Sequence, residues 1–273
     1  MPLPAPTAEF LAQLHSPNPV QMFKNGFRSF HEIKGLFVQY LIGLSICFFI
    51  SIILMGLLLF FIYSPVNELY FEKWSLFIQD WSSQKSAWLS WIQHLSTPIL
   101  WFLKITFIGL LAYLSLRLAT FFMIYWIDKL IEQLINHFRP HPDEGFSWKR
   151  FWATLKLSLS VTIKALLASV FFLFLSFIPF IGSILAYLGI SRTAGVDILS
   201  PYLLIVGEYD NSVIKAFPFK TKSMIKAGWF QGLIIVLPFI GWVLMPIFLI
   251  LQILGYAYHC ELQWQESKLV AGD

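Results

Sequence analysis

Two arginines lie within or beside long apolar stretches, where a fixed positive charge could hold a small anion. Arg117 falls in the apolar run 98–127, and an arginine inside a membrane span indicates a functional site unless the helix projects far enough to bring it to an interface. Arg192 comes with Asp197 in a polar break between apolar segments. The simpler interpretation puts that pair in a cytosolic turn. If the segment is one continuous helix, both residues lie in the membrane and could line a polar path.

Other chemistries lack the residues that they need. His137 and His141 are four positions apart, but Pro140 breaks the helix that would present both imidazoles on one face, so we expect a solvated loop and no metal site. Cys47 and Cys260 lie far apart in apolar stretches and predict small buried side chains. The motifs HExxH, GxSxG and GxxxxGKS/T are absent, so we expect no enzyme, no cofactor and no ATP-binding module.

Composition indicates the kind of element that must position these residues. Hydrophobic residues make up 58% of the 273 positions and charged residues only 12%, with a mean hydropathy of +0.70. Soluble domains carry roughly a quarter charged residues, because water must solvate their surface. The net charge of +4 comes from basic residues that flank apolar runs and form no stripe, so no nucleic-acid partner is expected. We predict an all-α integral membrane protein in contact with membrane lipids.

The first half of the chain predicts two membrane spans, at about 36–63 and 98–127, after a flexible tail at 1–19. Residues 36–63 contain no charge, and about 20 apolar residues suffice to cross a bilayer. We expect the first span to end at Ser64-Pro65 and residues 66–96 to form an interfacial helix. Residues 20–35 predict another helix, which either lies in the headgroup layer or packs on protein. Its apolar and basic positions are Phe23, Phe27, Phe30 and Ile33, and Lys24, Arg28, His31 and Lys34.

The second half contains two apolar stretches that are interrupted in corresponding places. Each carries the core P-F-I-G, whose proline and glycine are Pro179 and Gly182, and Pro238 and Gly241. Paired interrupted segments are typical of the broken helices of transporters. We predict two re-entrant hairpins, at about 157–207 and 227–259, with these residues at their tips. A single membrane domain over 20–262 and a C-terminal tail at 263–273 complete the organisation.

The distribution of basic residues predicts an orientation. Lys and Arg are more frequent before residue 36, in 128–156 and in 186–230 than in 64–97. The positive-inside rule therefore favours a cytoplasmic N-terminus. It also favours hairpins over simple spans, because a single crossing at 157–190 would put the basic segment 186–230 outside.

Several short stretches, together with this order of elements, carry a family resemblance. They are Leu130–Leu134 (L-I-E-Q-L), Phe177–Gly182 (F-I-P-F-I-G), Pro218–Lys220 (P-F-K) after Glu208–Asp210, and the pairs Leu237-Pro238 and Met245-Pro246. Over residues 20–262 the chain resembles the CysZ sulfate permeases, a family that includes the etoposide-induced membrane proteins. The resemblance implies a homo-oligomeric permease of the bacterial inner membrane that passes sulfate inward for cysteine biosynthesis.

The resemblance also implies where the anion binds. The family carries two arginines just before the first span, and the matching stretch here reads Glu32-Ile33-Lys34-Gly35. Lys34 and Gly35 are therefore the expected anion contacts, with Glu132, Arg117 and Arg192 as candidates for the pathway. The alternative function is a membrane-organising or lipid-handling scaffold that moves no solute. For transport these charged groups would face a cavity, and for scaffolding they would face headgroups or solvent.

Overall fold

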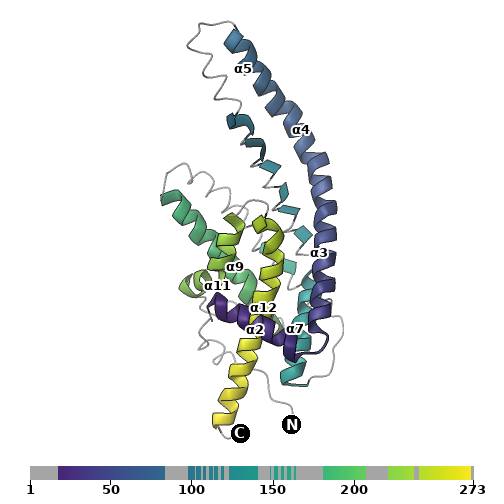
Figure 1. Ribbon diagram of the computed structural model, residues 1–273, viewed down its shortest axis with the longest axis vertical. Coiled ribbons are helices and arrows are strands. Elements are labelled where there is room, and N and C mark those ends of the chain that lie inside the picture. The colour runs from purple at the N-terminus through teal and green to yellow at the C-terminus, as the bar shows by residue number, and fades with distance from the viewer. Residues whose placement is uncertain are drawn as a thin grey trace. The chain divides into compact units, whose positions relative to one another are not determined.

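The computed structural model describes residues 18–83, 123–140, 181–206, 221–236 and 240–271, and scattered residues of 98–119 and 148–163. Every regular element in these ranges is a helix (Figure 1). The α-helices are α2 (Pro19–Glu32), α3 (Leu36–Leu58), α4 (Ser64–Val66), α5 (Lys73–Ser83), α7 (Ile124–Phe138), α9 (Ile181–Val206), α11 (Thr221–Val236) and α12 (Ile240–Ala271). The predicted all-α class is confirmed for the described residues.

The chain forms two compact units. One comprises residues 1–46 and 120–273 and contains α2, α7, α9, α11 and α12; the other comprises residues 47–119. The first unit has a well-buried core, and its largest fully buried side chains come mostly from α7 and α9. All the groups of the candidate site described below lie in this unit.

Glycine brings α2 against α12. Asn18 caps α2 by accepting a hydrogen bond from Gln21 N at 2.8 Å, and Pro19 opens the helix, where its missing N–H is harmless. A Cβ on Gly26 would lie 2.5 Å from Leu251 O, and a Cβ on Gly255 would collide with Met22 O. Small residues of this kind let helix backbones approach closely, as they do in membrane bundles.

The contact between α9 and α11 follows the same rule. Gly228 and Gly232 form a GxxxG pair on α11, and a Cβ at Gly228 would collide with Ser191 O of α9. Further along, Gly195 meets Met224 O, and the Tyr187 hydroxyl donates to Trp229 O at 3.0 Å. Successive residues along α9 thus contact residues of decreasing number along α11, so the two helices run antiparallel.

The helix that begins as α3 does not end at Ser64-Pro65, and the prediction that it ends there was wrong. Helical structure continues through α4 to α5, with π-helical stretches at Leu59–Tyr63 and Asn67–Glu72. Proline normally breaks a helix because it lacks an N–H and its ring clashes with the carbonyl of the preceding turn. A widened π-helical turn precedes Pro65 here and accommodates the ring. Residues 66–83 therefore extend this helix instead of starting a separate interfacial one.

Two helices of the described residues are long and apolar enough to cross a membrane, Leu36–Phe77 and Val243–Leu269. Only 11% of the apolar window in the first is buried inside the protein, against 72% in the second, so the first depends on another apolar environment to cover it. The first contains the predicted span 36–63. The second was expected as one arm of a hairpin followed by a tail, but α12 continues without a break to Ala271. The described residues of the predicted span 98–127 are helical apart from Met123, and its last residues open α7 at Ile124. The first arm of hairpin 157–207 lies largely outside the described residues.

Candidate functional site: buried polar groups along α12

Helix α12 presents polar side chains to the interior of the first unit. Gln252 and Glu261 are fully buried, and the described cores of α9, α11 and α7 surround the helix with apolar side chains. Polar groups at such positions are costly unless they are hydrogen-bonded. Their partners therefore define a candidate site.

Glu261 binds two groups from two other helices. Its Oε1 accepts from Arg139 Nη2 at 3.1 Å and from the Tyr202 hydroxyl at 3.0 Å. Arg139 is 8% exposed and follows α7 directly as its C-cap, in an extended backbone conformation. Glu261 Oε2 and Arg139 Nε have no hydrogen-bond partner among the described residues. The trio thus holds a charge pair in the interior and keeps one acceptor and one donor unused.

A pair of glutamines forms a second buried polar contact. Gln231 of α11 donates from Nε2 to Oε1 of Gln252 at 2.9 Å, and both side chains are at most 1% exposed. Gln231 Oε1 and Gln252 Nε2 find no partner among the described groups. Two amides that keep an acceptor and a donor unused in an apolar bundle are suited to a polar solute or to water.

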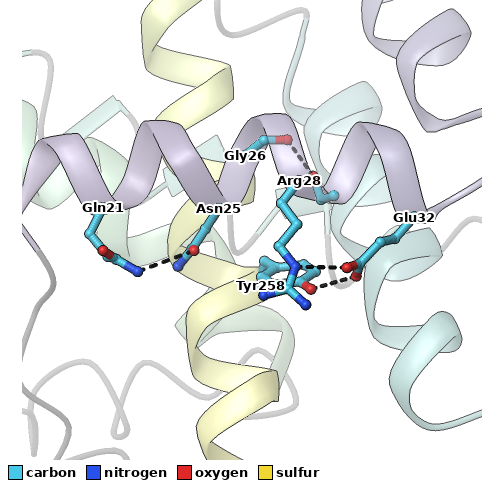
Figure 2. A network of polar contacts seen from close by, with 7 residues as sticks. Gln21, Asn25, Gly26, Arg28, Glu32 and Tyr258 are labelled. Carbon is cyan, nitrogen blue, oxygen red and sulfur yellow. Dashed lines mark hydrogen bonds and ion pairs between the residues drawn. The ribbon is translucent and has the colours of Figure 1, made fainter.

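Near the protein surface a third cluster ties α2 to α12. Arg28 Nε lies 2.7 Å from Glu32 Oε1, and Glu32 Oε2 accepts from the Tyr258 hydroxyl (Figure 2). The Arg28 guanidinium also lies over the Tyr258 ring, 5.7 Å from its centroid. The hydrogen bond from Tyr258, followed by the one from Arg28, holds the pKa of Glu32 below its ordinary value.

The structure brings some of the predicted site residues together. Lys34 and Gly35 form the exposed turn between α2 and α3, and Gly35 takes a left-handed φ of 86°. Lys34 O accepts from Gln133 Nε2 of α7 at 3.2 Å, which brings this turn to the helix that carries Glu132. The Lys34 and Glu132 stretches therefore adjoin, as a shared site requires.

Other predicted residues are not part of this group. Arg192 is exposed and Asp197 half-buried, both in the middle of the unbroken helix α9, so the cytosolic turn expected there was wrong. Gly195 lies between them and Pro201 follows, yet α9 continues through both residues, because Gly195 packs at backbone distance from Met224 O of α11. Gly182 and Gly241 lie in the first turns of α9 and α12. Arg117, Pro179 and Pro238 lie outside the described residues.

Sequence reasoning missed Arg139, Tyr202, Glu261 and the glutamine pair. One signal was present, because Glu261 is the first charged residue after the uncharged stretch 240–260, and Gln252 is a lone amide within it. The partners could not be found in this way, since Arg139 is 122 positions from Glu261 and Tyr202 is 59. The described residues contain no group of three or more His, Cys, Asp or Glu side chains suited to a metal ion.

The fold and these clusters define a class: an all-helical protein in which two helices could cross a membrane and polar groups are buried along one of them. Comparison with known proteins does not narrow this class. No family model, curated protein or solved structure matches the chain.

Proposed function

We propose that this protein is a permease for sulfate or a related small anion, inserted in the bacterial inner membrane through α3 and α12. The observation that carries the proposal is the line of buried polar groups on α12, some of whose donors and acceptors no described residue uses. A protein that only shapes a bilayer gains nothing from such groups, which cost free energy when buried. A route for a polar solute requires them.

The two P-F-I-G stretches support an anionic cargo. Their Ile-Gly residues open α9 at Ile181 and α12 at Ile240. Since α9 runs antiparallel to α11, and α12 follows α11 after three residues, both helix starts lie at the same end of the bundle (Figure 1). Helix N-termini carry unpaired N–H groups and a partial positive charge, which favour anions. Half-helix ends of this kind point at anionic substrates in transporters.

Arg139 adds a group suited to a tetrahedral anion. A guanidinium presents several N–H donors in a fixed fork, and its charge stays at all accessible pH values. Arg139 uses one Nη2 hydrogen bond on Glu261 and keeps Nε unpaired among the described groups. In this proposal the Glu261 carboxylate positions Arg139 and neutralises it between passages. The N-terminus lies in the cytoplasm and the permease assembles from several copies.

The test is uptake of labelled sulfate into proteoliposomes. Gln231→Leu with Gln252→Leu replaces both amides by apolar groups of similar size, so the bundle keeps its packing while the polar contact is lost. We expect uptake to fall at least tenfold in this double variant. The matched control is Gln21→Leu, at an exposed glutamine of α2. Equal uptake by the wild type and the double variant would remove the glutamine pair from the route, and no uptake above empty liposomes by folded wild type would refute the permease.

One observation favours the scaffold alternative. Lys34 and Arg192, both proposed for an anion pathway, are exposed at the surface of the first unit. Basic side chains at a surface suit lipid headgroups as well as a solute. If folded protein moves no sulfate but changes the size or curvature of the vesicles that contain it, the scaffold function holds instead.

A further inference from the structure

Helix α2 has four distinct sides, and one of them, which we call its back, packs against the rest of the protein. Met22, Gly26 and Ser29 are buried, and Met22 and Gly26 lie against Leu251 and Gly255 of α12. The helix crosses α12 instead of running along it (Figure 2). This contact fixes which residues of α2 point away from the bundle.

The two flanks of α2 differ in polarity. On one flank Phe23 packs edge-on against Phe248, with ring centroids 5.4 Å apart, and thus meets the apolar part of α12. On the other flank lie Gln21, Arg28 and Glu32, on the same side of the helix as Tyr258 (Figure 2). Beyond Tyr258, α12 becomes charged, beginning at Glu261. An apolar flank and a polar flank facing corresponding parts of a neighbouring helix are typical of a helix lying at a membrane boundary.

The side opposite the back is an exposed row, which we call the outer stripe: Val20, Lys24, Phe27 and His31. Spacings of four, three and four residues place all of them on one face. Val20 is 69% exposed and Phe27 61%, and Lys24 and His31 are exposed as well. No acidic residue belongs to the stripe, and the nearest one on this helix, Glu32, is engaged by Arg28 and Tyr258.

The contacts with α12 place α2 mostly in the second half of a possible crossing. Residues 240–260 contain no Asp, Glu, Lys or Arg, and about 20 such residues cross the hydrocarbon. Helix α2 touches α12 between Phe248 and Tyr258, from the middle of that stretch to near its charged end. If α12 crosses the bilayer, the polar flank of α2 faces the headgroup side of this crossing.

We infer that the outer stripe binds the surface of a bilayer that contains anionic phospholipid. Val20 and Phe27 insert between the acyl chains, while Lys24 and His31 contact phosphate-bearing headgroups. Lys24 supplies the charge, and His31 supplies a ring N–H donor. The inference rests on the membrane insertion in the proposed function and is independent of whether any solute is carried.

The charge of Lys24 predicts a measurable preference for anionic over neutral lipid. A lysine near an anionic membrane surface contributes about 1 kcal/mol, which corresponds to about fivefold in affinity. Loss of Lys24 should therefore weaken binding of anionic lipid about fivefold and leave binding of neutral lipid unchanged. Loss of the Phe27 ring should weaken both, since acyl chains are common to the two lipids.

The experiment counts lipids bound to the full-length purified protein by native mass spectrometry during titration with phosphatidylglycerol or phosphatidylcholine. The variants are Lys24→Gln and Phe27→Ser, with Lys226→Gln as a matched control at an exposed lysine of α11 in the same unit. Melting curves establish that each variant is folded. Selective loss of phosphatidylglycerol in Lys24→Gln, with Lys226→Gln like the wild type, is the expected result.

Two results would overturn the inference. Equal losses in Lys24→Gln and Lys226→Gln would mean that lipid follows the net charge of the protein and not the outer stripe. A dimer that Phe27→Ser dissociates, with unchanged lipid counts, would mean that a second copy covers the stripe. Sulfate uptake tests the permease separately, so lipid binding without uptake refutes only the permease, and uptake without selective lipid binding refutes only this inference.

Discussion

Replacing Gly255 by alanine should separate α2 from α12. Its added Cβ would collide with Met22 O, a backbone atom that cannot turn away as a side chain can. Forcing extra atoms into a packed contact costs roughly 1–3 kcal/mol. For a unit of this size each kcal/mol lowers the melting temperature by about 2–4 °C, so we expect a decrease of roughly 2–12 °C.

The chain offers a matched control at Gly56. A Cβ there would meet nothing within 4 Å, and the residue lies inside α3. Alanine is favoured over glycine in a helix by about 0.5–1 kcal/mol, so Gly56→Ala should melt slightly above the wild type. The two variants make the same chemical change and should have opposite effects.

The two buried cysteines provide the assay. Cys47 and Cys260 are free and buried, so a thiol-reactive probe labels each one only as its surroundings open. Heating the protein with the probe and identifying the labelled peptides gives a separate transition for each cysteine. In Gly255→Ala, Cys260 should become reactive at a lower temperature while Cys47 keeps its wild-type transition. If the melting temperature of Gly255→Ala equals or exceeds that of Gly56→Ala, close packing between α2 and α12 does not limit the stability of this unit.

Three further predictions follow from the polar clusters. Because the pKa of Glu32 is lowered in the folded protein, its carboxylate stabilises the folded state at pH values above the ordinary carboxyl pKa of 4.5. This contribution is lost as pH falls through the lower folded pKa. Below pH 5 the melting temperature should therefore drop less in Glu32→Gln than in the wild type. Arg139→Leu leaves Glu261 buried without its cation and should lower the free energy of unfolding by roughly 3–5 kcal/mol. The double variant Arg139→Leu with Glu261→Leu should recover most of the lost melting temperature. A double variant as unstable as the single one would contradict this reasoning. Lys34→Ala keeps the carbonyl that Gln133 uses, so it should lower sulfate uptake without lowering the melting temperature, and unchanged uptake would remove Lys34 from the anion site.

Features of the fold that depend only on residues close together in the sequence could be predicted. The uncharged stretch beginning at Leu36 predicted a long apolar helix, and the helical spacing after Pro19 predicted α2. One error came from proline. Pro65 was expected to end a helix that continues through it, and Pro201 and Pro246 likewise lie inside α9 and α12 without ending them. A proline predicts a local conformational cost, but tertiary structure and π-helical turns determine whether the helix accommodates it.

The face by which α2 packs could not be predicted from periodicity alone. Its apolar positions are compatible with a helix in the headgroup layer or packed on protein, and in the structure Phe27 is 61% exposed while Ser29 is fully buried. The reason is the contact with α12, where glycine permits a close backbone approach that a phenylalanine would prevent. Hydrophobicity therefore identifies the wrong face wherever small residues make the contact.

The same small residues connect packing with the candidate site. Gly228 and Gly255 let α9, α11 and α2 approach their neighbours at backbone distance, so the described bundle relies on close contact and not only on large apolar side chains. The unused hydrogen-bonding atoms of Gln231, Gln252 and Glu261 are costly in this interior. A bundle selected for stability alone would replace these side chains by leucine. Their presence in the interior, on α11 and α12, is therefore the strongest argument that this protein handles a polar species.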